Sequence, residues 1–163
     1  MCGFRTDFLL KPRYCYIRKG FVAPVTDYLR PGASDDTLRE MSTLGLAHIG
    51  DAVFELMVRT RLCLLGTSTA GKLHAQTVEF VSARAQAASA QRLIPELTAE
   101  ELDVFKRGRN AHVNSIPSNA THSEYHTATG IEALFGYLYL KGETERAGAL
   151  FETIVRGVDS DAT

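Results

Sequence analysis

The segment between Ser42 and Gly66 constrains the fold of this chain more than any other part of the sequence. Its apolar residues recur at three- and four-residue spacing, as they do along one side of an α-helix. A capping box at Thr37 and Glu40, or Ser42 alone, can start this helix, and Gly66 can end it. The spacing therefore predicts a long helix that begins between Thr37 and Ser42 and ends near Leu65.

An acid interrupts this apolar run. Asp51 lies within LAHIGDAVFEL, residues 46–56, directly after Gly50. A buried carboxylate without a partner costs several kcal/mol, so we expect Asp51 to be protonated, paired with an arginine or a helix N-terminus, or bound to a metal ion. Glu55 lies one turn later on the same helical face and can pair with Arg59 instead.

The rest of the chain also shows helical spacing, and no segment alternates with a period of two. Further helices are expected over residues 68–92, 98–110, 130–140 and 147–155. The segment 98–110 opens on a capping box of Thr98 and Glu101. Residues 111–129 show no clear period and predict a loop, with a helical turn within it as the alternative. The pattern predicts an all-α protein with an N-terminal extension (1–35), one helical domain (36–157) and a tail (158–163).

Composition narrows the class of protein further. The chain of 163 residues has a formal net charge of −1, but residues 1–34 carry a net charge of +4 and the remainder −5. The three cysteines have no zinc-site spacing, and no apolar run is long enough to span a membrane, so we expect a cytoplasmic protein with reduced thiols. The arginine-rich first residues leave an organelle transit peptide or an incorrect start codon as alternatives.

A second acid lies in another apolar helical stretch. Glu132 belongs to TATGIEALFGYLYL, with Gly136 one turn later. Thr129 and Glu132 have capping-box spacing, so Glu132 can simply cap its own helix. Alternatively, Gly50 and Gly136 let two helices approach closely, and two facing carboxylates then bind a hard cation such as Mg²⁺, which prefers oxygen ligands.

Basic and imidazole side chains supply the remaining candidates. The segment KRGRN holds a dense cluster of Lys106, Arg107 and Arg109. Such a cluster either complements the helix macrodipole at a helix C-terminus or contacts phosphates. His122 and His126 are four residues apart, but no third ligand accompanies them, so a zinc site is not expected.

Four motifs together resemble one family. AHIGDAVFELMVR is similar to the signature helix of ribonuclease III endonuclease domains, and GIEALFGYLYL is similar to their second acidic helix. The intervening KLHAQTVEFVSARAQA and FKRGRNA resemble the Mini-ribonuclease III branch, which lacks a double-stranded-RNA-binding domain. The resemblance covers roughly residues 38–155 and implies a ribonuclease III-like helical bundle.

The resemblance also implies a function. It predicts a metal-dependent endoribonuclease that cuts double-stranded RNA as a homodimer, with Asp51 and Glu132 as catalytic residues that bind Mg²⁺. It further predicts maturation of the large-subunit (23S) ribosomal RNA precursor, with a ribosomal protein as a possible helper. Its predicted RNA contacts are Lys106, Arg107, Arg109 and Asn110, and its predicted dimer contacts are His48 and Phe54.

The chain departs from the family pattern at four positions. Ala47 and Thr129 occupy places where full-length ribonuclease III has two further acids, a reduction shared by the Mini-ribonuclease III branch. His48 and His126 replace the usual tyrosine and a basic residue. Only 23 residues follow Leu140, too few for a double-stranded-RNA-binding domain. The alternatives are a non-catalytic ribonuclease III-like subunit, which the retained acids disfavour, and an unrelated helical interaction module.

Overall fold

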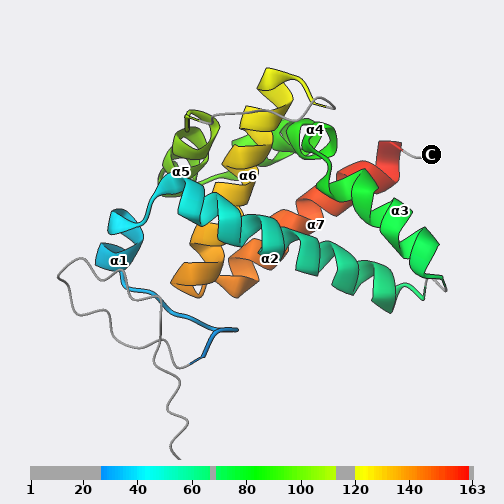
Figure 1. Cartoon of the computed structure of the whole chain (residues 1–163), viewed down its shortest axis with the longest axis horizontal. Helices are drawn as coiled ribbons and strands as arrows, with labels where there is room; N and C mark the ends of the chain where they lie inside the picture. Colours follow the sequence, from blue (N-terminus) through cyan, green and yellow to red (C-terminus); the bar gives the residue numbers. More distant parts are fainter. Residues whose placement is uncertain (1–26, 67–68, 113–119, 162–163) are drawn as a thin grey trace, which may run out of the picture.

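The computed structural model describes residues 27–66, 69–112 and 120–161, and all regular structure within these ranges is helical (Figure 1). This result confirms the predicted all-α class. The elements are α1 (Asp35–Glu40), α2 (Thr43–Leu64), α3 (Ala70–Val81), α4 (Ala83–Leu93), the short 3₁₀ helix η1 (Ile94–Glu96), α5 (Ala99–Arg109), α6 (His122–Lys141) and α7 (Thr144–Asp161). Within the described ranges, no helix is long and apolar enough to cross a membrane.

Helix α6 forms the centre of the bundle. It packs against α1, α2, α4, α5 and α7, and Figure 1 shows it passing behind α2. Every residue from 128 to 138 is buried except Glu132, which is partly exposed. A helix that is apolar all round must be covered on all sides, so Glu132 marks the place where this central helix reaches the surface.

One stripe of α2 faces α6. Buried residues recur every fourth position, as a helix face requires: Leu46, Gly50, Phe54, Val58 and Leu62. The Phe54 ring packs edge-on against Phe135 of α6 and Phe151 of α7, with centroid distances of 5.1 and 5.8 Å. These rings join three helices in one core.

The observed caps settle where the first helices begin. Ser42 caps α2, as predicted, by accepting a hydrogen bond from the Gly45 N–H at 3.0 Å. The prediction of a capping box at Thr37 is wrong, because Thr37 lies inside α1 and its own N–H donates to the Ser34 hydroxyl. Gly66 follows α2 with a φ of +81°, a conformation that glycine adopts without strain.

Two helix boundaries differ from the predictions. The helix expected over 68–92 is broken at Ser82, whose extended backbone ends α3 and whose side chain caps α4. Helix α6 begins at His122 rather than near Gly130, because Thr121 and Glu124 form a capping box. Thr129 therefore lies inside α6, where its hydroxyl donates to the Tyr125 carbonyl at 3.0 Å, and it does not cap Glu132.

The segment before α1 contacts the end of α6. The Ala33 N–H donates to the Leu140 carbonyl at 2.7 Å, and the Tyr139 hydroxyl donates to the Tyr28 carbonyl. Residues 1–26, which carry most of the predicted basic extension, lie outside the described residues. The domain boundary at residue 35 therefore stays a prediction. Residues 28 and 33, which precede this boundary, already contact α6.

Candidate active site

Two glycines bring the backbones of α2 and α6 into contact. A Cβ atom on Gly50 would lie 1.7 Å from the Glu132 carbonyl oxygen, and one on Gly136 would lie 2.0 Å from the Leu46 carbonyl oxygen. No side chain fits at either position. The crossing therefore places Asp51, which follows Gly50, beside the turn of α6 that carries Glu132.

The two acids have different environments. Asp51 lies on the exposed side of α2, so the expectation that it is buried in the apolar run is wrong. Partial burial of its carboxyl group still raises its pKa; the nearby Glu55 carboxylate raises it further, and His48 lowers it. Asp51 is thus at the rim of the site rather than in the core.

Glu132 is the more strongly perturbed acid. Burial raises its pKa to about 7, the Asp51 carboxylate adds to this effect, and a hydrogen bond from the Gln86 side chain opposes it. Asp51 directly follows Gly50, whose backbone touches that of Glu132, so the two acids lie on adjacent turns of the two helices. Like charges in a partly desolvated site repel each other, so neither environment favours two ionised groups.

The donor set fits a hard divalent cation. Within the described part of the chain, neither Asp51 nor Glu132 forms an ion pair with a basic side chain, which removes the structural salt bridge considered above. Both acids offer only oxygen, and no three His, Cys, Asp or Glu side chains of the described residues meet in a metal-binding group. Two carboxylates suit an ion that keeps several water ligands, as Mg²⁺ does.

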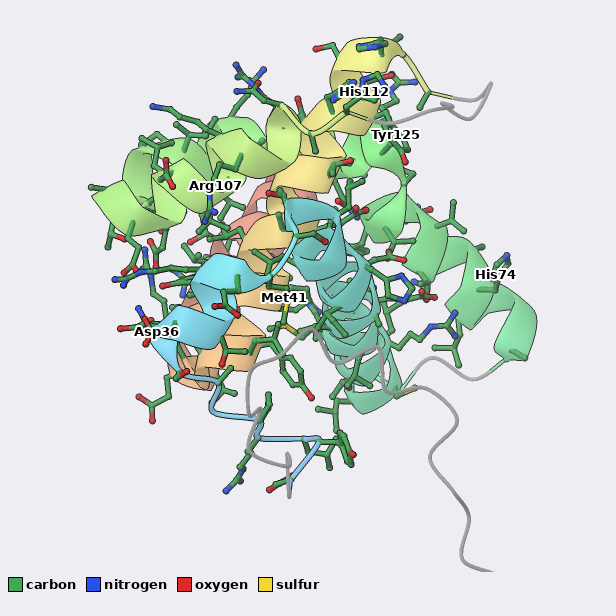
Figure 2. All side chains as sticks on the ribbon, turned by 60° about the vertical axis from the view of Figure 1, so that its left-hand side comes forward. Asp36, Met41, His74, Arg107, His112 and Tyr125 are labelled. Carbon is green, nitrogen blue, oxygen red and sulfur yellow. The ribbon has the colours of Figure 1, made fainter. Side chains whose placement is uncertain are left out.

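The other residues considered as ligands from the sequence are not part of the pair formed by Asp51 and Glu132. Glu55 accepts a hydrogen bond from the Arg59 guanidinium at 2.8 Å, as expected for residues one turn apart. Ala47 and Thr129, at the places of the family's other acids, are both buried. The rings of His122 and His126 lie with centroids 4.3 Å apart, and no third His, Cys, Asp or Glu among the described residues forms a metal-binding group with them. His74 and His112 are exposed (Figure 2).

A second close approach connects the basic cluster to the same helix. A Cβ atom on Gly108 would lie 2.8 Å from both the Gly130 Cα and the Thr129 carbonyl oxygen, so the last turn of α5 contacts α6 about one turn before Glu132. The His126 Nδ1–H donates to the Arg109 carbonyl at 2.9 Å, since a carbonyl oxygen can only accept. This bond holds the end of α5 against α6.

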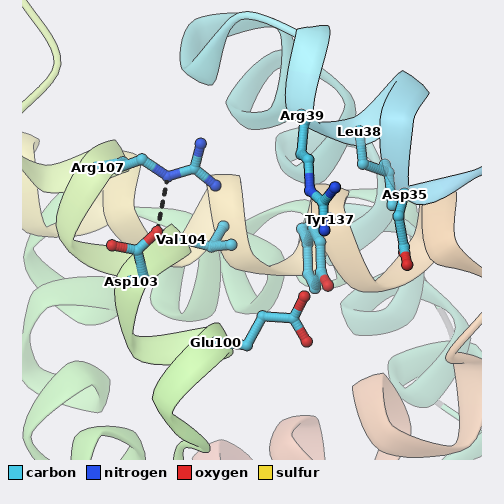
Figure 3. Close-up of a pocket in the computed structure, with 8 residues that line it drawn as sticks. All are labelled: Asp35, Leu38, Arg39, Glu100, Asp103, Val104, Arg107 and Tyr137. Carbon is cyan, nitrogen blue, oxygen red and sulfur yellow. Dashed lines mark ion pairs between the residues drawn. The ribbon is translucent and has the colours of Figure 1, made fainter.

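The basic side chains of α5 are not equivalent. The Arg107 guanidinium pairs with Asp103 at 3.2 Å, in a groove of about 220 Å³ that Glu100, Arg39 and Tyr137 also line (Figure 3). Lys106 and Arg109 are exposed and form no ion pair within the described residues. Asn110 is the exposed C-cap of α5. Lys106 and Arg109 are therefore the cations best placed to contact phosphates.

The two residues predicted to contact a second protomer have different environments in the structure. His48 is exposed on α2, one turn before Asp51, and remains available to a partner. Phe54 is only 1 % exposed and its ring fills the core between α6 and α7, so its assignment to a dimer interface is wrong. The exposed apolar residues of α2 are instead Leu44, Ala52, Leu56 and Leu64.

Sequence reasoning missed Gln86. It occupies a core-facing position of the alanine-rich helix α4, in line with the buried residues Ser89, Ala90 and Leu93. The signal was a long polar side chain at a position where the helical period calls for an apolar one. Its significance depends on α4 packing against α6, which periodicity within one helix does not reveal.

The fold agrees with the comparison to known proteins. The family model "Ribonuclease III domain" matches residues 44–143, a range that contains both acids and the basic cluster. The chain belongs to the ribonuclease III family.

Within that family, the chain is similar to proteins named Mini-ribonuclease 3. The relative from Thermoanaerobacter sp. (strain X514) is 43% identical over 119 residues, covering 73% of this chain and 84% of the relative. The relative from Gloeobacter violaceus is 45% identical over 113 residues, covering 69% and 82%. A crystal structure of a Fusobacterium nucleatum protein matches with a TM-score of 0.69 and 30% identity, covering 76% of this chain and 98% of that one.

Proposed function

We propose that this chain cuts double-stranded RNA as a Mg²⁺-dependent homodimer, and that its substrate is a precursor of large-subunit ribosomal RNA. Membership of the ribonuclease III family makes it an endoribonuclease. The observation that carries the proposal is the contact of α2 with α6 at Gly50 and Gly136, which makes Asp51 and Glu132 neighbours, with no basic partner for either among the described residues.

The proposed chemistry is hydrolysis of a phosphodiester bond. Asp51 and Glu132 are the residues that would hold the ion. The chemistry supplied by a bound Mg²⁺ is charge neutralisation at the phosphate and a lowered pKa for the attacking water. Glu132 must be ionised to contribute its charge, so the protonated form favoured near pH 7 and below competes with the ion.

The basic cluster supports RNA as the substrate. Lys106 and Arg109 are free to contact phosphates and lie on the helix that packs against α6 near Glu132. Double-stranded RNA is recognised mainly through its shape, phosphates and 2′-hydroxyl groups. We therefore propose binding with little sequence preference, in which Arg107 and Asn110 contribute less than Lys106 and Arg109.

A homodimer formed through α2 fits the surface of this helix. Leu56 and Leu44 are 59% and 45% exposed, although they belong to a helix whose other face is the core. Covering such residues with a second copy removes apolar surface from water. His48 lies on the same exposed helix, so we propose that it contacts the partner close to Asp51.

Cleavage of a structured precursor tests the proposal directly. The full chain is incubated with a large-subunit ribosomal RNA precursor transcript, with and without Mg²⁺, beside a single-stranded RNA of the same length. We expect Mg²⁺-dependent cuts in the duplex regions only, and none from Asp51→Asn. Binding without cleavage under all conditions would instead identify a non-catalytic subunit. A cytoplasmic location and a ribosomal protein helper remain parts of the proposal for cell-based tests.

A further inference from the structure

Gln86 is the most deeply buried polar side chain near the two acids. It is 1% exposed, on a helix whose other core-facing residues are small or apolar. Helix α4 packs along α6, the helix of Glu132. A primary amide at such a position loses its hydrogen bonds to water, so its partners within the protein indicate why it is there.

The Gln86 amide lies near two groups that accept hydrogen bonds. The Nε2 group donates to the Val81 carbonyl oxygen at 3.2 Å, across the break between α3 and α4. The hydrogen-bonding influence of the Gln86 side chain on the pKa of Glu132 places the amide beside that carboxylate as well. Because both neighbours are acceptors, the Nε2 group suits this position better than the amide oxygen does.

The amide oxygen is left without a partner among the described residues. The Gln86 Oε1 atom is fully buried, and an unsatisfied buried acceptor typically costs about 1–3 kcal/mol. Leucine at this position would avoid that cost in a core of alanine and leucine. A polar group kept at a cost, and directed at a candidate metal ligand, indicates a role in function rather than in packing.

We propose that Gln86 is a positioning residue for the reaction: its N–H holds the Glu132 carboxylate toward Asp51. This inference rests on the proposed metal site. Partners that orient a ligand from behind typically change metal affinity or activity by about 10–100-fold when they are removed.

The competing role is structural. The bond to Val81 alone could justify Gln86 as a brace at the junction of α3 and α4. The two roles differ in what they alter. A brace affects folding, whereas a positioning residue affects cation affinity and turnover in the folded protein and leaves RNA binding unchanged.

The test substitutes Gln86 with methionine, which keeps the shape of the side chain and removes its hydrogen bonds. Gln76→Met is the matched control, since Gln76 of α3 also has a buried, unpartnered Oε1 but perturbs the pKa of neither acid. Calorimetric titration with Mn²⁺ in the absence of RNA gives cation affinity, steady-state cleavage gives kcat and KM, and thermal unfolding in chelator gives stability.

We expect Gln86→Met to weaken Mn²⁺ binding by about 10–100-fold and to lower kcat by at least tenfold, with KM for duplex RNA unchanged. Gln76→Met should keep the Mn²⁺ affinity of the wild type. Mn²⁺ affinity and kcat of folded Gln86→Met within twofold of the wild type would overturn the inference, whatever its melting temperature.

A second variant keeps the inference testable if Gln86→Met does not fold. Gln86→Asn retains a buried amide but draws it back by one methylene group from Glu132, so it should lose Mn²⁺ affinity to a similar extent. An unchanged affinity in this variant would overturn the inference as well. If the wild type bound no Mn²⁺ and Glu132→Gln cleaved normally, the proposed metal site would be wrong. That outcome is distinct from a failure of the Gln86 inference alone, in which the wild type binds Mn²⁺ and the Gln86 variants bind it equally well.

Discussion

Among the acids of the described residues, Glu132 has the most strongly raised pKa. Its helix is otherwise buried from 128 to 138, and the Asp51 carboxylate raises the pKa of Glu132 further. An acid in such a place is unfavourable for the fold unless a cation compensates for it. A metal site and a structural salt bridge therefore predict opposite changes in stability when one of the two acids is neutralised in the absence of metal.

Neutralising either acid should therefore abolish cleavage without unfolding the protein. We expect Asp51→Asn and Glu132→Gln to lose Mg²⁺-dependent activity, to bind duplex RNA as before, and to melt at the same or a higher temperature than the wild type in chelator. The reason is that each change removes a repulsion and leaves no cation unpaired. Loss of about 3 kcal/mol with cleavage preserved would instead show a structural ion pair.

The raised pKa of Glu132 predicts how metal-free stability depends on pH. Its folded pKa is about 7, above the ordinary value of 4.5, so between these values the folded state retains a proton that the unfolded state has lost. The free energy of unfolding in chelator should fall as pH rises through this window, by about 1–3 kcal/mol from this group.

Glu132→Gln isolates this contribution from those of other acids. The variant should be more stable than the wild type above pH 7, and the difference should shrink towards pH 4.5. Chemical denaturation at several pH values measures it. A stability difference that does not change with pH would mean that Glu132 titrates normally in the folded protein.

The sequence singles out the two acids of the candidate site but not the side chains around them. Asp51 and Glu132 were identified because each is an acid in an apolar helical run, beside or one turn from a glycine. Gln86 was not, because its partner lies on another helix. Phe54 was placed on the wrong side of α2, since an apolar residue in a helix with several apolar faces does not show which face meets the core.

At the scale of elements, the glycine contacts determine how closely the helices approach. Gly50→Ala would force a Cβ atom into the backbone of α6, where no side chain can move aside. We expect a loss of about 3 kcal/mol or more, together with loss of cleavage. Circular dichroism during thermal unfolding measures the effect.

Gly148→Ala is the matched control for this prediction. Gly148 lies in α7, and a Cβ atom there meets nothing within 4 Å. Alanine favours helix over glycine, so this variant should be unchanged or stabilised by up to about 1 kcal/mol. Equal stability of Gly50→Ala and the wild type would mean that the two helices do not touch as described.

The last turn of α5 should supply salt-dependent affinity for RNA. If Lys106 and Arg109 of two protomers contact phosphates, the double variant with alanine at both positions should flatten the dependence of log affinity on log salt by a slope of about 3. Arg107→Ala is compared with Lys106→Ala and with Arg109→Ala as single variants, and it should change the slope less than either because Asp103 already pairs with Arg107. Equal effects would contradict this ranking.

Element boundaries were predictable where a capping motif stood alone. Thr98 and Glu101 form the expected capping box. The beginning of α6 was missed because its first turns are polar and partly exposed, which hides the helical period. The break at Ser82 was missed because serine within an alanine-rich run can continue a helix or cap the next one, and only packing decides between these outcomes.

At the scale of the whole molecule, the exposed face of α2 predicts a second protomer. Leu56→Asp should convert the protein to a monomer at micromolar concentration, since it places a charge in the proposed interface. Ile94→Asp, on η1, is the control and should leave the mass unchanged. Analytical ultracentrifugation measures both. A wild type that is already monomeric would remove α2 as a dimer interface.

The contact between Gly50 and Gly136 also bears on the order of events during folding. It joins residues 86 positions apart, and such distant contacts form only after the intervening chain has closed. Asp51 and Glu132 are consequently separate until the final helix packing is achieved. Affinity for a divalent cation should thus appear last in a refolding experiment, after helix formation, and a fluorescent Mn²⁺ indicator in a stopped-flow instrument can time the completion of the native state.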